Sequence, residues 1–124
     1  RQEVLDLVNA QRAKYGLTAL EMGDDDLTAA AQTRAEEIAV VNSHVRPDGS
    51  KCFTVLKDYG VTDTPTGENA AWGSVSPEEV VNAWMNSEGH RANILNPEAR
   101  KMSVGYYYNS NSTWGHQWIQ IFTK

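Results

Sequence analysis

The sequence has only one cysteine, Cys52, among its 124 residues, so it cannot form an internal disulfide or a cysteine-rich metal site. A chain of this length buries roughly two-thirds of the surface that its unfolded form exposes, so packing alone can supply a core. The length also fits one domain better than two, and we assign residues 1–124 to a single domain.

Clusters of basic residues and long apolar runs are missing as well. The net charge is −5, and the Lys and Arg residues are dispersed, which argues against binding to a nucleic-acid backbone. No apolar run approaches the roughly 18 residues of a membrane-spanning helix. The chain has no signal peptide and enters a helical pattern directly after Arg1, as a domain excised from a longer protein would.

Three common catalytic motifs are absent: a Gly-rich phosphate loop, the His-Glu-x-x-His zinc helix and the Gly-x-Ser-x-Gly nucleophile elbow. The lone Cys52 lies at an apolar helical position beside Phe53 and Val55. Buried cysteines are usually inert, so we interpret Cys52 as a packing residue rather than a nucleophile.

Apolar residues recur at helical spacing in the first third of the chain. A first helix is expected from Val4 to Tyr15, with Gly16 ending it. A second helix follows the acidic run Asp24–Asp26, which can cap it and complement its dipole. The small alanines of this helix predict that another element packs closely against it. Its apolar stripe consists of Leu27, Ala30, Ala31, Ala35, Ile38 and Val41.

Turn-forming residues divide the middle of the chain. A short helix from Cys52 to Tyr59 is expected, with Ser50 as its cap and Gly60 as its end. Residues 61–67 are rich in Thr, Pro and Gly and indicate a loop, which leads into Glu68 and a short apolar run.

The last third of the chain contains a clear helix start, and after it the residue pattern changes from helical to strand-like. Ser76-Pro77-Glu78-Glu79 has the form of a capping box, and the chain re-caps or bends near Ser87–Gly89. Residues 104–108 and 114–122 are β-branched and aromatic, and the polar turn 109–112 between them indicates a β-hairpin. Helices first and strands last indicate the α+β class, with helices packed on a small antiparallel sheet.

The aromatic residues of this hairpin have two interpretations. Tyr106–Tyr108, Trp114 and Trp118 are expected to serve mostly as sheet and core residues, because β-strands favour aromatic side chains. The alternative is that some of them line an aromatic ligand groove.

The candidate functional residues are three histidines and one glutamate. His44 lies in the loop after the Ala-rich helix, His90 near a helix start and His116 in the last strand. They share no fixed spacing and do not by themselves define a site. Glu68 enters a segment that should be buried, so its carboxylate needs a partner. That partner could be a histidine, in acid–base or metal chemistry, or an arginine or backbone amides in a purely structural role.

Five segments, in order, resemble the CAP superfamily (cysteine-rich secretory, antigen 5 and plant pathogenesis-related 1 proteins), and above all its bacterial SCP-like branch. The resemblance covers nearly the whole chain. The segments are VLDLVNAQRAKYGLTAL at 4–20, SHVRPDG at 43–49, GENAAWG at 67–73, WMNSEGHRANILNP at 84–97 and WIQIF at 118–122.

The resemblance implies an α-β-α sandwich with a central cleft lined by two histidines and two glutamates. His44 corresponds to the first histidine and Glu68 to the glutamate of the Gly-Glu-Asn motif. For the second histidine we favour His90, from the Gly-His-Arg-x-Asn-Ile motif, over His116. His116 is one residue out of register with the eukaryotic strand motif, and such a slip turns a strand side chain to the opposite face.

The second glutamate departs from the family pattern, because the matching position is Ser87. The adjacent Glu88 is a substitute candidate, although a shift of one residue turns a helical side chain by about 100°. The tetrad is therefore expected to reduce to His44, Glu68 and His90.

The resemblance implies a secreted or cell-surface protein, expected to be monomeric, whose cleft binds a divalent cation such as Zn²⁺ through His44 and His90. A small ligand or peptide would bind there. One alternative is a metal-assisted hydrolase in which Glu68 acts as the base with His44 and His90 as catalytic partners. Another is a lipid or sterol carrier. The fold does not choose among these functions.

Overall fold

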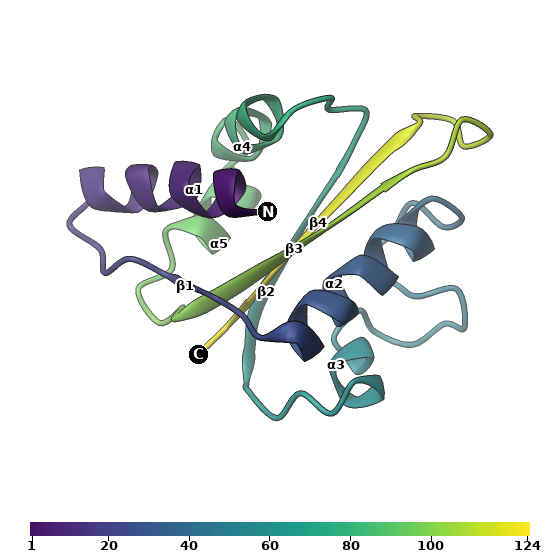
Figure 1. Cartoon of the computed structure of the whole chain (residues 1–124), viewed down its shortest axis with the longest axis horizontal. Coiled ribbons are helices and arrows are strands. Elements are labelled where there is room, and N and C mark those ends of the chain that lie inside the picture. The colour runs from purple at the N-terminus through teal and green to yellow at the C-terminus, as the bar shows by residue number, and fades with distance from the viewer.

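The computed structural model describes all 124 residues, and helices cover both faces of one four-stranded sheet (Figure 1). The predicted α-β-α sandwich is thereby confirmed. The helices are α1 (Gln2–Lys14), α2 (Asp25–Ile38), α3 (Thr54–Asp58), α4 (Pro77–Met85) and α5 (Glu88–Ile94). The strands are β1 (Glu21–Met22), β2 (Pro65–Trp72), β3 (Lys101–Tyr108) and β4 (His116–Thr123).

The sheet has the strand order β1-β3-β4-β2. The predicted hairpin forms its centre, with β3 and β4 antiparallel along their whole length. Strand β2 lies at one edge and is antiparallel to β4, whereas β1 lies at the other edge and is parallel to β3. The sequence did not predict β1, because a strand of two residues leaves no periodic pattern. It did not predict β2 as a strand either, and the loop expected over residues 61–67 is wrong from Pro65 onward, where β2 begins.

Both faces of the central strand β4 are buried, and each belongs to a different core. Trp118 and Phe122 pack against α1, α4 and α5 in one cluster. Ile119 and Ile121 pack against α2 and α3 in the other. This alternation follows from the period of two in a strand, and it explains why the segment reads as a continuous apolar and aromatic run.

The local signals at helix starts are confirmed at two positions. The side chain of Asp24 accepts a hydrogen bond from the Leu27 amide at 2.9 Å, and Ser76 accepts one from the Glu79 amide at 3.2 Å. The expected cap at Ser50 is wrong, because the short helix starts later, after Phe53. The Ser50 hydroxyl instead donates to Asp48 at 2.6 Å within the preceding turn.

The close packing predicted for the Ala-rich helix is present between α2 and β3. A side-chain carbon built on Gly105 of β3 would lie 2.1 Å from the backbone oxygen of Ala31. The backbones of the two elements are therefore in direct contact, which is possible only with small residues on both sides.

Candidate functional site

The edge strand β2 directs two neighbouring polar side chains to opposite faces of the sheet. Glu68 shares its face with Ala70, which belongs to the core under α2 and α3. Asn69 faces the other way, where its side-chain amide donates to the backbone oxygen of His90 in α5 at 3.1 Å. The Glu-Asn pair therefore connects the two helical layers across one strand.

Glu68 is the centre of the site, and its side chain is only 1% exposed. Arg34 of α2 donates to both of its oxygens, from Nε to Oε2 at 2.8 Å and from Nη2 to Oε1 at 3.0 Å. Nδ1 of His44 lies 2.8 Å from Oε1. Of the partners considered from the sequence, Glu68 therefore has both a histidine and an arginine.

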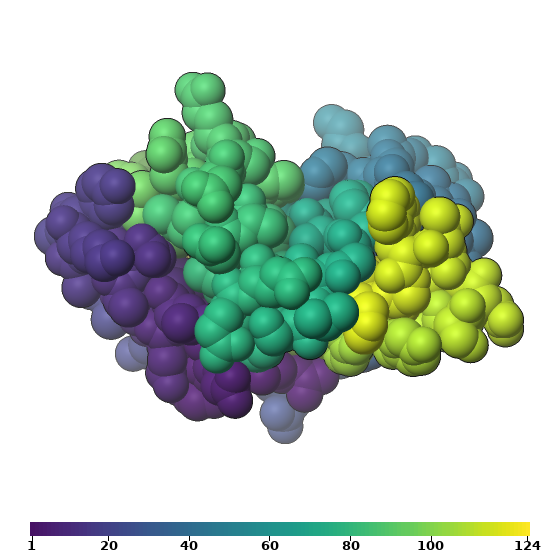
Figure 2. Space-filling view, turned by 90° about the horizontal axis from the view of Figure 1, so that it is seen from above, coloured from purple at the N-terminus to yellow at the C-terminus, as the bar shows by residue number.

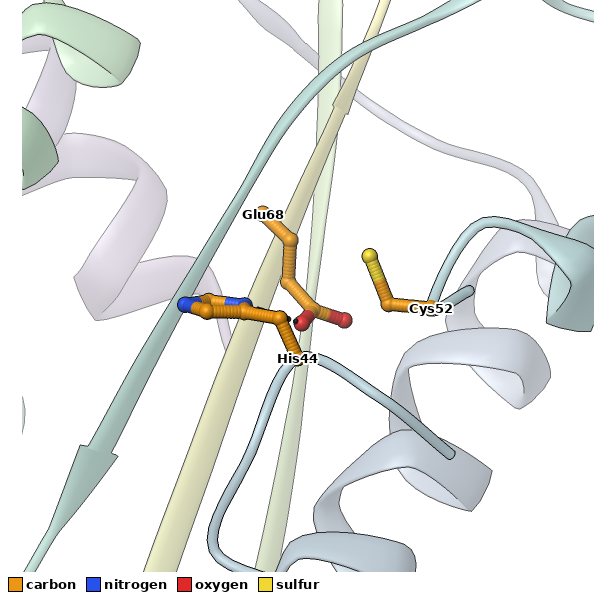
Figure 3. A group of neighbouring side chains, drawn as sticks. All are labelled: His44, Cys52 and Glu68. Atoms are coloured by element: carbon orange, nitrogen blue, oxygen red, sulfur yellow. Dashed lines mark hydrogen bonds and ion pairs between the residues drawn. The ribbon is translucent and has the colours of Figure 1, made fainter. Parts of the chain in front are cut away.

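The ionic state of Glu68 follows from these contacts. Burial alone would raise the pKa of Glu68, but the hydrogen bonds from His44 and Arg34 outweigh it, and the pKa lies below its ordinary value. An ionised carboxylate cannot donate, so the proton of the shared hydrogen bond belongs to Nδ1 of His44. The other ring nitrogen, Nε2, points away from Glu68 (Figure 3).

The loop that carries His44 is fixed on both sides of the histidine. Before it, Nη2 of Arg34 donates to the backbone oxygen of Ser43 at 3.0 Å. After it, Arg46 donates to both oxygens of Glu37, from Nε to Oε1 at 3.0 Å and from Nη2 to Oε2 at 2.7 Å. The His44 side chain is nevertheless 55% exposed. His44 is thus an oriented imidazole with one nitrogen open to solvent.

The pKa values of His44 and His90 are expected to be shifted in opposite directions from that of an ordinary histidine. The hydrogen bond to Glu68 raises the pKa of His44, whereas burial and the charge of His44 lower that of His90. NMR titration of the ring protons should place the His44 midpoint above, and the His90 midpoint below, those of the same residues in the urea-unfolded chain. Coinciding native and unfolded midpoints would contradict the geometry.

Cys52 joins His44 and Glu68 in a group of three metal-ligating residue types. One ligand atom from each lies within 4.8 Å of the others, and the sulfur faces the carboxylate from the side opposite the imidazole (Figure 3). Burial, together with the negative charge of Glu68, raises the pKa of Cys52 to about 11. Cys52 is therefore a protonated thiol at neutral pH, which agrees with its interpretation as an unreactive buried residue.

The backbone of His90 is held against β2 by a buried amide network on the other face of the strand, and His90 is not part of the close group of His44, Cys52 and Glu68. Nδ2 of Asn93 in α5 donates to Oδ1 of Asn69 at 2.9 Å, and Nδ2 of Asn69 also donates to Gln120 of β4 at 3.1 Å. A side chain at Gly67 would collide with Asn93, whose Oδ1 would lie 2.5 Å away. Seen from above, the β2 segment (teal) lies between α4–α5 (green) and the α2 half of the molecule (blue) (Figure 2).

His116 lies apart from Glu68, and no hydrogen bond or ion pair joins Glu88 to the site. His116 pairs with Tyr108 at the start of β4, about 17 Å along the strand from the partner of Glu68 at 3.4 Å per residue. It also faces the side of the sheet opposite to Glu68. Glu88 is exposed in the first turn of α5 and makes no ion pair.

The structure has two cavities, and neither is lined by His44, Glu68 or His90. One, of about 450 Å³, lies between α1 and α4, and the other, of about 550 Å³, lies between α3 and the start of β2. Arg34 and Cys52 fill the space around Glu68, so His44 stands over a buried carboxylate at the surface rather than inside a deep pocket.

Arg34 and Asn69 were not predicted as site residues. Arg34 falls seven residues after Leu27, on the buried face of α2, where a charged residue requires a partner. That position was a usable signal, because the sequence had already identified Glu68 as a carboxylate needing a partner. For Asn69 the only signal is its place beside Glu68 in the Gly-Glu-Asn segment.

Residues 5–122 match the profile of the cysteine-rich secretory protein family, CAP. The chain is 42% identical over 120 residues to the uncharacterized protein YkwD of Bacillus subtilis (strain 168). The alignment spans 95% of this chain but 46% of YkwD, so the chain accounts for less than half the length of this relative.

Solved structures show the same fold. An extracellular protein containing an SCP domain from Bacillus anthracis aligns with a TM-score of 0.85 at 27% identity, over 99% of this chain and 39% of that one. An outer surface protein of Borrelia burgdorferi aligns with a TM-score of 0.79 at 25% identity, over 99% of this chain and 90% of that one. The sandwich is therefore shared across proteins with low sequence identity.

Proposed function

This chain belongs to the CAP family, and from its site we propose that it is a binding module in which His44 and His90 hold a divalent metal ion. The observation that carries the proposal is the 2.8 Å hydrogen bond between Nδ1 of His44 and Glu68, made by a side chain that is 55% exposed. Metal-binding histidines typically donate their other ring N–H to a carboxylate, which fixes the tautomer and raises the basicity of the ligand nitrogen.

The donor set fits a borderline-soft cation such as Zn²⁺, which accepts imidazole nitrogens readily. The lowered pKa of His90 keeps that ring neutral, as a metal ligand must be. Glu68 would support His44 rather than bind directly, because Arg34 already occupies both of its oxygens. A bound Zn²⁺ would leave positions open for water or a small ligand or peptide.

The same contacts bear on the hydrolase alternative. Glu68 has little capacity to act as a base, since its charge is balanced by Arg34 and its oxygens are shielded from solvent. A base at this site would be Nε2 of His44, oriented by Glu68 as in carboxylate–histidine pairs of hydrolases. Neither cavity of the structure is lined by His44, so we favour binding at the surface over catalysis in a substrate pocket.

We also propose that the protein acts outside the cell or at its surface. The support is the description of its structural relatives as extracellular and outer surface proteins. In the chain itself, no helix has the length and apolar character needed to cross a bilayer.

Calorimetric titration of the metal-stripped domain with Zn²⁺ at pH 7.5 tests the metal proposal. We expect micromolar or tighter binding, weakened at least about tenfold in His44→Ala and in His90→Ala. His116→Ala is the matched control and should bind like the wild type, because His116 lies apart from Glu68. Lowering the pH through the raised pKa of His44 should weaken binding, because the proton competes for Nε2.

Two results would refute the proposal. The first is no heat of binding in the wild-type protein. The second is equal affinity in the wild type and His44→Ala, which would place any bound ion elsewhere.

A further inference from the structure

The hairpin of β3 and β4 carries an uncharged surface at one end of an otherwise charged molecule. No Asp, Glu, Lys or Arg occurs from Met102 to Thr123, although 22% of the whole chain is charged. The part of this segment from Tyr106 to His116, here called the hairpin tip, projects beyond the helices at the upper right of Figure 1. It forms the yellow end of the molecule in Figure 2.

Aromatic rings gather on one face of the hairpin tip. Tyr106 and Tyr108 lie opposite Trp118 and His116 in the register, with ring centroids 4.6 and 4.8 Å apart. The hydroxyl of Tyr106 also lies 2.6 Å from Nδ1 of His116. Trp118 is buried, so its ring anchors this array to the core.

The outer rings of the tip are open to solvent. Tyr108 is 55% exposed and Trp114 57% exposed. Each ring lies near a glycine, Tyr108 near Gly115 and Trp114 near Gly73, and the Tyr108 ring also contacts the ring of His116. The tip thus offers exposed aromatic rings with polar atoms at their edges, a combination that is typical of interaction sites.

The loop that supports these rings is ordered by its own hydrogen bonds. The amides of Asn109 and Ser112 donate to Gly115 and Asn109 at 2.8 and 3.0 Å. The Ser112 hydroxyl donates to the backbone oxygen of Asn109 at 2.7 Å and accepts from the Gly115 amide at 3.1 Å. An ordered loop loses little conformational entropy on binding, which favours recognition.

We propose that the hairpin tip binds a neutral polysaccharide, with sugar rings stacking on Tyr108 and Trp114. The C–H face of a sugar is weakly positive and matches the negative face of an aromatic ring. Sugar hydroxyls match the exposed side chains of Ser110, Asn111 and Thr113, which the hydrogen bonds inside the loop leave available. The lack of charge disfavours an ionic ligand.

The test is depletion of the protein by insoluble cellulose and chitin, followed by titration with cellohexaose and chitohexaose monitored by tryptophan fluorescence. We expect binding to at least one of these neutral β-linked glycans. Trp114→Ala and Tyr108→Ala should each weaken it about tenfold. Tyr15→Ala is the matched control, because Tyr15 is 60% exposed but lies at the end of α1 away from the tip. His44→Ala should also bind normally, which separates this surface from the metal site.

Three outcomes would overturn the proposal. One is the absence of binding to all four glycans, and another is unchanged binding in both tip variants whose circular dichroism is native. The third is a dimer in sedimentation experiments that is lost in Trp114→Ala, since the exposed rings would then serve contact between two copies of the chain.

Discussion

Replacing Glu68 with alanine is expected to lower the free energy of unfolding by about 3–5 kcal/mol. Both side chains of the pair are buried, with Arg34 0% and Glu68 1% exposed. The substitution would remove the only partner of the buried Arg34 Nε, and Glu37, 2.9 Å from Nη1, would be the one carboxylate left to the guanidinium. The buried charge would then be only partly compensated, and the penalty for its lost hydration adds to the loss of the contacts themselves.

Urea unfolding of the variant measures this effect, and two further variants define its cause. Asp63→Ala removes a carboxylate from the exposed pair with Lys101, 3.6 Å apart, and should cost less than about 1 kcal/mol. The double variant Arg34→Met/Glu68→Leu should recover much of the stability lost in Glu68→Ala, because no charge remains buried. A loss below about 1 kcal/mol in Glu68→Ala would contradict this account and show that Glu37 or water compensates the charge of Arg34.

The stabilising effect of Glu68 should also depend on pH. Because its folded-state pKa is lowered, this contribution is present above the unfolded value of about 4.5 and is lost as the pH falls through the folded-state pKa. The raised pKa of His44 gives the opposite pH dependence. The stabilisation from His44 is present below about pH 6.5, its unfolded pKa, and is lost as the pH rises through the folded-state pKa. The two contributions should therefore coexist most fully between about pH 4.5 and 6.5.

Gly105→Ala is the second substitution with a large expected effect, a loss of about 3 kcal/mol or more, at the upper end of overpacking costs. The new carbon would lie 2.1 Å from the backbone oxygen of Ala31 and 2.7 Å from Cα of Gln32. These are backbone atoms that cannot rotate away, so α2 would have to separate from β3. The packing of Leu27 and Ile38 against the sheet would be disturbed with it.

Gly89→Ala provides the matched control for this prediction. Gly89 lies in α5, and a side-chain carbon built on it meets nothing within 4 Å. Alanine in a helix is favoured over glycine by roughly 0.5–1 kcal/mol, so this variant should be as stable as the wild type or more so. Similar thermal unfolding temperatures for the two variants would contradict the close packing of α2 on β3.

Several features of the fold could be predicted because they depend on neighbours in the sequence. The Asp24 and Ser76 caps involve residues three positions apart, and the stripe on α2 follows from the geometry of one helix. The hairpin follows from two apolar and aromatic runs around a polar turn. Strand β1 could not be predicted, because it exists only through its parallel pairing with β3.

The site was predictable in its residue types but not in its pairing. The sequence by itself determined that Glu68 enters a buried segment and must have a partner, and that Arg34 lies on the apolar face of α2. Only the tertiary structure decided that these two residues meet and that His44 shares the same carboxylate. The physical reason is that periodicity reports which way a side chain faces within its own element. Which partner that side chain meets depends on the position of α2 relative to β2, and packing across the whole core sets this position.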